Sequence, residues 1–443
     1  MNDEIIGRIF ARRSFGIKPG LDTTRAMLAA MGNPEKNIRT VHVAGTNGKG
    51  SVCAMIASVL RYTGIEAGLY TSPHLVRLNE RFSINGKDIE DDELFPLLEE
   101  VEKAAMQVER DGGGVPTFFE CMTALGMEWF KRKGVKLVVA ETGMGGRLDS
   151  TNVLSPLLCV ITRIGLDHMM YLGDTIAAIA GEKAGIIKEG VPVVCAEMSD
   201  AAKAVIERTA AERKAPTVMV GDAVGVRRVS GNVRGQKVAI TSASEDYGLF
   251  TMKLAASYQI ENIATAVAAI ETLERVLGID FGRKTVVKGL ADAQWPGRFQ
   301  CISENPDVLI DGAHNPDGAE ALVKALHDAK CGRKIRFVVG QSADKDLEGF
   351  FRTIAPICGA LWTVPMKNPR TAQPTTLAEI AKRHGIKRVV ACPTISDGLN
   401  AAKTDALEDE DKGLVVACGS LFLVGEILEG LSVARPGLTT GSY

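Results

Sequence analysis

The chain has 443 residues, which is too long for a single ordinary hydrophobic core, so two or three domains are expected. Its composition, 46% hydrophobic and 24% charged, is typical of a soluble globular protein, and a net charge of −2 gives no reason to expect a nucleic acid or a membrane as partner. Nine scattered cysteines without a CxxC pair argue against a disulfide framework or zinc site and favour reduced thiols in a cytoplasmic protein.

The first half of the chain predicts a parallel sheet. Residues 1–4 include Asp3 and Glu4 and lead into no apolar core, so no secretory signal is expected. From residue 22 to about 215, helical and strand patterns alternate, which indicates a doubly wound α/β sheet with helices on both faces and ligands at the carboxyl ends of its strands. The predicted strands are 38–44, 66–70, 136–140, 157–161 and 191–195, and the predicted helices are 22–31, 49–63, 90–110, 117–133, 174–187 and 199–213.

A phosphate-binding loop is predicted after the first of these strands. Glycines allow backbone N–H groups to turn toward an anion, the helix start adds partial positive charge, and Lys49 has the length to reach the β- and γ-phosphates. The common P-loop has Gly six residues before the lysine and Ser or Thr directly after it, positions that Val43 and Gly50 occupy here. A plain strand-to-helix turn is the alternative, but strand and lysine together favour a nucleoside triphosphate. The predicted loop residues are Gly45, Thr46, Asn47, Gly48, Lys49, Gly50 and Ser51.

Two further strand ends carry oxygen groups. Glu141 directly follows the strand 136–140 and opens the glycine-rich segment 141–149. A carboxylate in this place suits Mg²⁺ in a P-loop protein, although a helix cap or a surface acid is the alternative. Ser72 follows the strand 66–70 in the sequence Ser-Pro-His-Leu, where a capped turn is the alternative.

Other polar residues of this half are less specific. His168 lies beyond the strand 157–161, but a lone histidine is as often a hydrogen-bonded residue as a functional one. Lys183 lies near the end of a predicted helix, where interaction with the helix dipole is the simpler interpretation. Asn85 and Gly86 predict a hairpin turn.

A change of pattern follows the first alternation. Residues 217–256 predict a small antiparallel addition to the first domain, and helices resume at 259–277 and 282–293. The segment 295–298, Trp-Pro-Gly-Arg, predicts a hinge because Pro and Gly punctuate it.

Beyond the hinge, a second alternation predicts a smaller doubly wound domain. Asp311 and Asn315 follow its first strand and suit a ribose or base, with a plain helix cap by Asn315 before Pro316 as the alternative. The apolar stretch 414–428 is interrupted by Gly, Ser and Glu, as expected for a buried strand and helix, and 434–443 is expected to be mobile. The predicted strands are 307–310, 335–340, 360–364, 388–391 and 413–418.

Taken together, these motifs resemble the folylpolyglutamate synthase and dihydrofolate synthase family, which belongs with the ATP-dependent amide ligases that include the Mur peptidoglycan enzymes. The Lys-Gly-Ser ending of the loop is the form that this family uses. The resemblance implies a P-loop domain over 1–297 and a C-terminal Rossmann-like glutamate-ligase domain over 298–433. Five matching segments occur in order, namely 45–51, 72–75, 141–149, 181–185 and 311–316.

The resemblance also implies roles at the nucleotide and metal. Lys49 and its loop would hold the ATP phosphates, and two Mg²⁺ ions are expected, one on Ser72 and Glu141 and one on His168. Lys183 matches the family lysine that CO₂ converts to a carbamate, so Lys49, Glu141, His168 and Lys183 are the expected catalytic set. The remaining nucleotide contacts are expected from Asn262 at the adenine, Arg298 at the phosphates, and Asp311, His314 and Asn315 from the second domain.

For the pterin, the resemblance implies a second group of residues. Aromatic residues at helical spacing are more often core, so at least one of Phe118 and Phe119 is expected in the core. Tyr258 stands where the family commonly has His, and Met144 where it commonly has Leu, and neither is expected to touch the chemistry. The implied residues are Lys18, Pro19, Gly20, Thr117, Phe118, Phe119, Glu120, Leu148, Asp149 and Ser150.

A charge argument supports the modified lysine, provided that the fold brings Lys183 to the metal. At about 4 Å and an effective dielectric of about 20, an ammonium facing Mg²⁺ costs roughly 8 kcal/mol. Such an ammonium would be expelled or deprotonated, whereas a carbamate reverses the sign of the charge and supplies oxygen ligands.

The implied activity is the ATP-dependent joining of L-glutamate to a folate or dihydropteroate carboxylate through an acyl phosphate, by a monomeric enzyme acting on one or both acceptors. Another Mur-type amide ligase is an alternative, but the nucleotide-sugar domain of the peptidoglycan enzymes has no room in the 44 residues before Gly45. A P-loop nucleotide switch that does not ligate is the alternative from another class.

Overall fold

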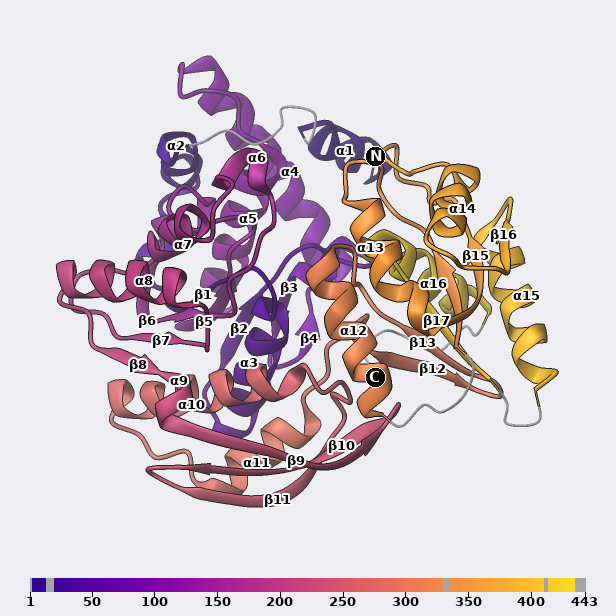
Figure 1. Cartoon of the computed structure of the whole chain (residues 1–443). Helices are drawn as coiled ribbons and strands as arrows, with labels where there is room; N and C mark the ends of the chain where they lie inside the picture. The colour runs from indigo at the N-terminus through magenta and orange to yellow at the C-terminus, as the bar shows by residue number, and fades with distance from the viewer. Residues whose placement is uncertain (1, 13–19, 330–334, 410–412, 435–443) are drawn as a thin grey trace. The chain divides into compact units, whose positions relative to one another are not determined.

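In the computed structural model, which describes residues 2–12, 20–329, 335–409 and 413–434, the chain divides into two units (Figure 1). Unit 1 comprises the described residues up to Gly225 together with Ile240–Tyr247 and Glu261–Ala293. Unit 2 comprises Val226–Ala239, Gly248–Ile260 and the described residues from Gln294 onward. Among the described helices, none has the length and apolar character needed to cross a membrane.

Unit 1 is built on a sheet of eight strands. In spatial order the strands are β4 (Lys87–Asp88), β3 (Phe82–Ile84), β2 (Ala67–Tyr70), β5 (Leu137–Glu141), β1 (Arg39–Ala44), β6 (Ser155–Ile161), β7 (Val193–Cys195) and β8 (Thr217–Met219). The six strands from β2 to β8 pair in parallel, and β3 and β4 add an antiparallel hairpin at one edge. The central strands β5 and β1 are almost wholly buried, as is expected for strands of a parallel sheet whose two faces are both covered.

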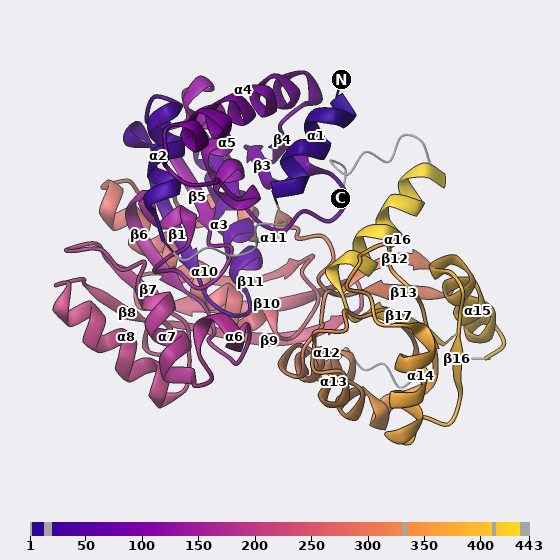
Figure 2. The same ribbon diagram turned by 90° about the horizontal axis from the view of Figure 1, so that it is seen from above.

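Helices cover this sheet. They are α1 (Asn2–Ala11), α2 (Asp22–Ala30), α3 (Lys49–Thr63), α4 (Asp91–Arg110), α5 (Phe118–Arg132), α6 (Met169–Leu172), α7 (Ile176–Ala184), α8 (Asp200–Glu212), α9 (Val220–Ala223), α10 (Gln259–Leu277) and α11 (Arg283–Asp292), with short 3-10 turns η2 (Pro34–Asn37), η3 (Leu78–Arg81) and η4 (Ser150–Val153). Helix α3 packs on β1, β2 and β5 and against α11, while α4 and α5 lie side by side (Figure 2).

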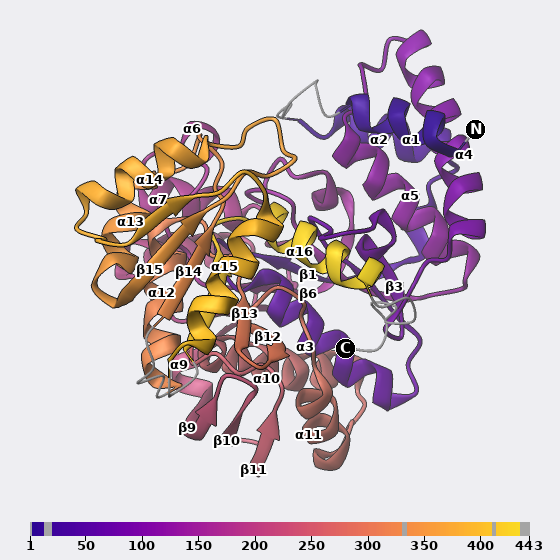
Figure 3. The ribbon, with the colours of Figure 1, turned by 90° about the vertical axis from the view of Figure 1, so that its right-hand side faces the viewer.

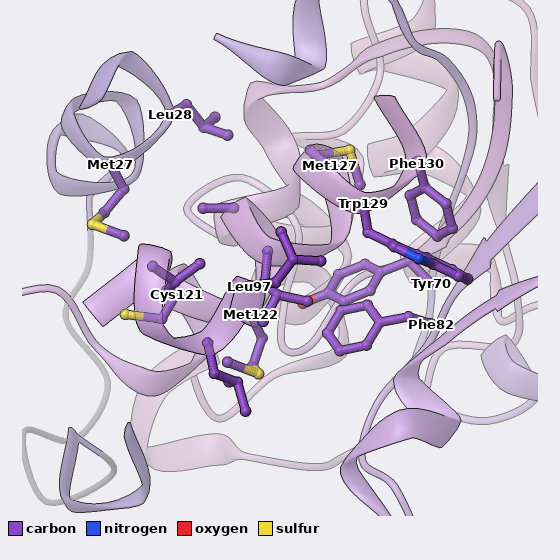
Figure 4. Close-up of a cluster of buried hydrophobic side chains, with 14 of the residues drawn as sticks. Met27, Leu28, Tyr70, Phe82, Leu97, Cys121, Met122, Met127, Trp129 and Phe130 are labelled. Atoms are coloured by element: carbon purple, nitrogen blue, oxygen red, sulfur yellow. The ribbon is translucent and has the colours of Figure 1, made fainter. Parts of the chain in front are cut away.

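An apolar cluster of unit 1 lies between α2, α4, α5 and the β2–β3 edge of the sheet. Tyr70 and Phe82 stack there with ring centroids 5.7 Å apart, beside Leu97 and Met122 (Figure 4). These residues come from four different elements, so this core fixes the end of β2 relative to the start of α5.

Unit 2 contains a six-stranded sheet. In spatial order its strands are β12 (Gln300–Glu304), β13 (Asp307–Ile310), β17 (Leu414–Cys418), β14 (Ile335–Val339), β15 (Cys358–Thr363) and β16 (Val389–Ala391). All neighbours pair in parallel except β12, which is antiparallel to β13. Helices α12 and α13 pack together on one side of this sheet, with α16 on the other side in Figure 2, and Figure 3 shows the sheet from another direction. The helices are α12 (Pro316–Asp328), α13 (Leu347–Ile354), α14 (Pro374–Arg383), α15 (Ile395–Leu407) and α16 (Leu421–Ala434), with the 3-10 turn η5 (Ala355–Ile357).

The α/β class and the two doubly wound sheets are confirmed, but the structure divides the chain differently from the predicted boundary at 297/298. Unit 1 ends at Ala293, and the addition expected over 217–256 is not a part of unit 1 alone. Residues 217–219 form the edge strand β8, the short helix α9 follows, and residues 224–252 contain a three-stranded sheet of β9 (Val224–Asn232), β10 (Gly235–Ser242) and β11 (Asp246–Met252).

The physical reason is that the β9–β10 turn belongs to the second core. Val233 and Ala255 are buried in the main apolar cluster of unit 2. Gln236 holds this region by donating hydrogen bonds to the carbonyl oxygens of Leu254 and Ala256. A pattern of alternating residues predicts strands, but it carries no information on which of two cores they join. The predicted tail, 434–443, lies outside the described residues from 435 onward.

Candidate functional site

The glycine loop between β1 and α3 has little spare room. Gly48 has φ +92°, and a Cβ there would lie 2.2 Å from Oδ1 of Asn262, while a Cβ on Gly45 would lie 1.8 Å from Oγ1 of Thr162. These contacts require glycine at both positions, and they place Asn262 of α10 directly against the loop. The hydroxyl of Thr46 is held at 3.0 Å from the carbonyl oxygen of Gly165, so the loop is anchored to the segment after β6.

Two lysines meet at this loop. Lys49 Nζ donates to the carbonyl oxygens of Gly45 and Thr46, at 3.1 and 3.3 Å, and Lys183 Nζ donates to the same Gly45 oxygen at 2.7 Å. Lys183 is only 3% exposed, and its burial, followed by repulsion from Lys49, lowers its pKa to about 7. The carboxylates of Asp167 and Asp149 oppose part of that shift. Near pH 7 this amine is therefore substantially neutral.

The glycine-rich segment after β5 positions Lys183. A Cβ on Gly146 would lie 2.9 Å from the carbonyl oxygens of both Glu182 and Lys183, and a Cβ on Gly185 would lie 2.3 Å from Cβ of Arg147. The Arg147 amide donates to the Glu182 carbonyl oxygen at 2.7 Å. The segment thus packs backbone to backbone on the end of α7, which a larger side chain at either glycine would prevent.

Glu141 and Ser72 are brought together at the same edge of the sheet. In the parallel pairing of β1 with β5, Glu141 is the register partner of Val43, so it lies at the strand end that leads into the glycine loop. Its side chain is 5% exposed, and Oε2 accepts the backbone N–H of Ser72 at 3.1 Å. A buried carboxylate oxygen beside a phosphate-binding loop fits Mg²⁺, which is usually held by one or two carboxylates together with phosphate and water.

The second expected metal position has less support. His168 follows β6 with φ +51°, its side chain is 45% exposed, and its Nε2 lies 3.7 Å from Oδ2 of Asp167. Across the described residues, no group of three or more His, Cys, Asp and Glu side chains is arranged to hold a metal ion. Asp167 is one of the charges that act on Lys183, and sequence patterns did not single it out.

A buried network that the sequence did not predict holds Asp149. Its Oδ1 accepts the hydroxyl of Thr151 at 2.6 Å, and its Oδ2 accepts the amide of Met144 at 2.8 Å. The Thr151 oxygen lies 2.8 Å from Nε2 of His42, whose burial lowers its pKa to about 3 and keeps the imidazole neutral. Both Asp149 oxygens therefore hold the loop after β5, although Asp149 was expected to line the pterin pocket.

The residues expected around the pterin divide into structural and half-buried groups. Thr117 and Glu120 form a capping box at the start of α5, and the Glu120 carboxylate also accepts the hydroxyl of Thr24 at 3.1 Å. Phe118 is buried in the core and stacks on Phe10 at 5.3 Å, which confirms that at least one of the aromatic pair is a core residue. Phe119 is half-buried and lies so close to Gly143 that a Cβ there would be 2.5 Å from its ring.

The other residues of that set are more scattered. Leu148 is exposed, and Ser150 forms a 2.7 Å hydrogen bond with the hydroxyl of Thr123. Gly20 is described and has φ +138°, whereas Lys18 and Pro19 lie outside the described residues.

In unit 2, Asp311 is saturated with protein donors. Its Oδ2 accepts the Tyr258 hydroxyl and the Phe299 amide, both at 2.8 Å, and its Oδ1 accepts the Ala313 amide at 2.8 Å. Burial raises the pKa of Asp311, and the charge of Arg298 opposes that rise. Tyr258 was expected not to touch the proposed chemistry, and this stays a prediction; the structure shows only that the tyrosine holds Asp311, a residue of the predicted nucleotide site.

The neighbours of Asp311 are equally fixed. Arg298 packs over Gly312, where a Cβ would lie 2.0 Å from its Nη1. His314 Nδ1 lies 2.8 Å from the carbonyl oxygen of Gly312. Asn315 is the N-cap of α12, and its Oδ1 accepts the Gly318 amide at 2.7 Å. The helix-cap alternative thus describes the Asn315 side chain.

Replacing Asn315 with alanine is expected to reduce the free energy of unfolding by about 1 kcal/mol, because the Gly318 amide loses its acceptor. Urea unfolding of the two proteins measures the difference. The variant Asn315→Asp keeps an acceptor and should unfold like the parent. A tenfold rise in the KM for ATP without loss of stability would instead assign Asn315 to the nucleotide.

Comparison with known proteins identifies relatives along nearly the whole chain. Residues 43–270 match the Mur ligase middle domain, and residues 297–421 match the Mur ligase glutamate ligase domain. The dihydrofolate synthase/folylpolyglutamate synthase of Bacillus subtilis is 38% identical over 365 residues, covering 82% of this chain and 85% of that protein. The folylpolyglutamate synthase of Lacticaseibacillus casei is 33% identical over 406 residues, covering 91% of this chain and 92% of that protein.

A solved structure agrees with these sequence matches. The folylpolyglutamate synthase of Mycobacterium tuberculosis complexed with ADP superimposes with a TM-score of 0.88 at 29% identity. The match covers 96% of this chain and 98% of that one.

Proposed function

Because the chain belongs to the folylpolyglutamate synthase and dihydrofolate synthase family of Mur ligases, we propose that it uses ATP to join L-glutamate to the carboxylate of dihydropteroate, of a reduced folate, or of both. The observation that carries this proposal is the meeting of Lys49 and Lys183 on the Gly45 carbonyl, at the strand edge that also carries buried Glu141. The Lys49 ammonium, the Lys183 amine with its lowered pKa and the Glu141 carboxylate lie around one glycine loop, and such a set suits a metal-bound triphosphate.

The loop and Lys49 bind the phosphates of ATP. In the structure Lys49 donates only to carbonyl oxygens of its own loop, so it is free to exchange them for phosphate oxygens at little cost. Asn262 lies against Gly48 and is placed to contact the nucleotide beside the loop. The ADP complex of the Mycobacterium tuberculosis relative supports nucleotide binding by this fold.

Glu141 and Ser72 hold Mg²⁺, which supplies charge stabilisation to the phosphoryl group during transfer. Ser72 is positioned for this because its own amide fixes the Glu141 carboxylate. Lys183, as a carbamate, would add a negative oxygen group near the Gly45 carbonyl of the loop. The low pKa of its amine favours this modification, since only the neutral amine reacts with CO₂.

Two bond exchanges complete the reaction. A carboxylate oxygen of the acceptor attacks the γ-phosphorus, the bond to ADP breaks, and an acyl phosphate forms. The amine of L-glutamate then attacks the acyl carbon, loses a proton, and expels inorganic phosphate to leave an amide. Lys49 stabilises the charge on the moving phosphoryl group, and the half-buried Phe119 offers the acceptor an apolar face beside the Glu141 segment.

Replacing Glu141 with glutamine is expected to raise the Mg²⁺ concentration for half-maximal activity by about tenfold or more, because the amide keeps the shape but loses the charge. Activity titrations with Mg²⁺ at saturating ATP measure this. Glu182→Gln is the matched control, since that glutamate is paired with Arg147. An unchanged Mg²⁺ requirement in Glu141→Gln would remove Glu141 from the metal site.

Phosphate release tests the function as a whole. The protein is incubated with ATP, Mg²⁺ and L-glutamate, with dihydropteroate and tetrahydrofolate supplied in separate reactions, and the products are identified by mass spectrometry. The proposal predicts phosphate release only when an acceptor and glutamate are both present, with a product heavier by one glutamyl residue. Steady ADP release in the absence of both the acceptor and L-glutamate would instead favour a P-loop nucleotide switch that does not ligate.

A further inference from the structure

Arg81 is a buried cation at the end of η3 with few partners in the protein. It is 4% exposed, its Nε donates to Nδ1 of His74 at 2.8 Å, and its guanidinium carbon lies 5.2 Å above the ring centroid of Phe118. Its Nη1 is buried without a hydrogen-bond partner. Neither the imidazole nitrogen that accepts this hydrogen bond nor the aromatic ring supplies a full negative charge.

The charges that face Arg81 do not neutralise it. Among the described residues, the hydrogen bond to His74 is the polar contact of its guanidinium, Nη1 has no partner, and burial lowers its pKa. Glu80 acts on it from farther away, but the Glu80 oxygens already accept the amides of Leu75, Val76 and Arg77. An uncompensated buried cation is costly, so such a group commonly marks a place where a ligand brings the missing charge.

The position of Arg81 relates it to the site already described. Its carbonyl oxygen accepts the amide of Thr71 at 3.1 Å, and the next amide, that of Ser72, binds Glu141. Glu141 is also the carboxylate whose charge acts on Arg81 beyond ion-pair range. A metal ion held by Glu141 would offset the charge of this carboxylate, so the Arg81 guanidinium would be left with less compensation.

We infer that Arg81 forms the carboxylate subsite of the acceptor, where its guanidinium binds the carboxylate group that ATP will activate. This inference rests on the proposed function. In the proposed function the glycine loop and Lys49 bind the phosphates of ATP, whereas Arg81 lies against the ring of Phe118. The planar fork of a guanidinium matches a planar carboxylate through two parallel hydrogen bonds.

The surroundings of Arg81 also indicate how the subsite opens. Phe10 of α1 stacks on Phe118 at 5.3 Å and lies edge-on to His74 at 6.3 Å, so one aromatic ring covers both partners of the guanidinium. In this proposal, a movement of Phe10 gives the acceptor carboxylate access to the guanidinium, which keeps its hydrogen bond to His74.

The test compares Arg81→Met and Arg81→Lys with the parent. Acceptor binding is measured by calorimetry on the full chain in the presence of ADP and Mg²⁺, with dihydropteroate and its carboxamide analogue as ligands. Arg81→Met should bind dihydropteroate about 30-fold more weakly but bind the carboxamide as the parent does. The dihydropteroate affinity of Arg81→Lys should lie between those of the parent and Arg81→Met, because lysine keeps the positive charge but lacks the two parallel donors of the guanidinium. Arg77→Met is the matched control, since that arginine is 49% exposed and paired with Asp91 in the same loop.

Three results would overturn the inference. One is unchanged dihydropteroate binding in Arg81→Met. Another is an equal loss of affinity for dihydropteroate and for the carboxamide, which would show that Arg81 has a structural role. The third is a rise in the KM for glutamate alone, which would assign the carboxylate to the amino acid. If Arg81→Met does not fold, the parent decides the matter, because a parent that binds acid and carboxamide equally has no carboxylate subsite. If the parent ligates no pteroate or folate at all, the proposed function fails and this inference fails with it.

Discussion

Replacing Lys49 with alanine is expected to lower kcat for glutamate ligation by about 1,000-fold or more, because the phosphoryl group loses its nearest fixed cation during transfer. The folded state should be almost unaffected. Lys49 is half-buried, and its ammonium donates only to two carbonyl oxygens of its own loop, both of which can turn to water when the side chain is removed. Steady-state phosphate release and thermal unfolding of the same sample measure both quantities.

The matched control is Arg61→Ala in the last turn of the same helix, where an exposed cation lies far along α3 from the loop. Its activity and stability should remain close to those of the parent. Ligation by Lys49→Ala within tenfold of the parent, with a normal melting curve, would remove this lysine from the catalytic set. A variant that unfolds would instead show that the Gly45 carbonyl needs both lysines for stability.

Removal of Lys183 is the second change with a large expected effect. Lys183→Ala should lower kcat by about 1,000-fold, since the carbamate oxygens are lost, and a small carboxylate such as formate should restore part of the activity. In buffer equilibrated with ¹³CO₂, the parent should show a carbamate carbon signal that this variant lacks. With an amine pKa of about 7, the signal should weaken as the pH falls through that value, because protonation removes the reactive amine.

Lys188→Met provides the spectroscopic control. Lys188 also lies in a buried region and also has a lowered pKa, but it donates to the carbonyl and side-chain oxygens of Asn152 instead of the glycine loop. The carbamate signal should persist in this variant. Absence of the signal in the parent, together with nearly full activity in Lys183→Ala, would show that the lysine acts unmodified or not at all.

The strand-end motifs could be found from the sequence because each depends on local pattern. An apolar run followed by glycines and a charged residue predicts a strand that delivers that residue to one edge of a parallel sheet. Lys49 and Glu141 were placed in this way, and the register of β1 with β5 brings their segments together.

Residues that depend on distant partners could not be found in this way. His42 lies in an apolar strand, and its partner Thr151 is 109 residues away, so no local pattern reveals the network that holds Asp149. Arg81 looks like an ordinary loop arginine until its burial is known. Tyr258 stands far along the chain from Asp311, and its hydrogen bond became visible only through the packing of unit 2.

Capping residues show a further limit. A polar residue at the start of a helix serves equally well as a cap or as a ligand contact, and the sequence is the same in both cases. Thr117, Glu120 and Asn315 all matched segments that a family resemblance associates with ligands, yet their side chains form helix caps. The division of the β9–β11 sheet between two units has a similar cause, because strand patterns do not reveal which core the strands join.

The central claim is that ATP activates an acceptor carboxylate as an acyl phosphate at the edge of the sheet that holds Lys49, Lys183 and Glu141. Dihydropteroate labelled with ¹⁸O in its carboxylate tests this most directly. The account predicts that one ¹⁸O atom appears in the inorganic phosphate for each amide formed with L-glutamate, and that Lys49→Ala abolishes the transfer. Amide formation with unlabelled phosphate would contradict it.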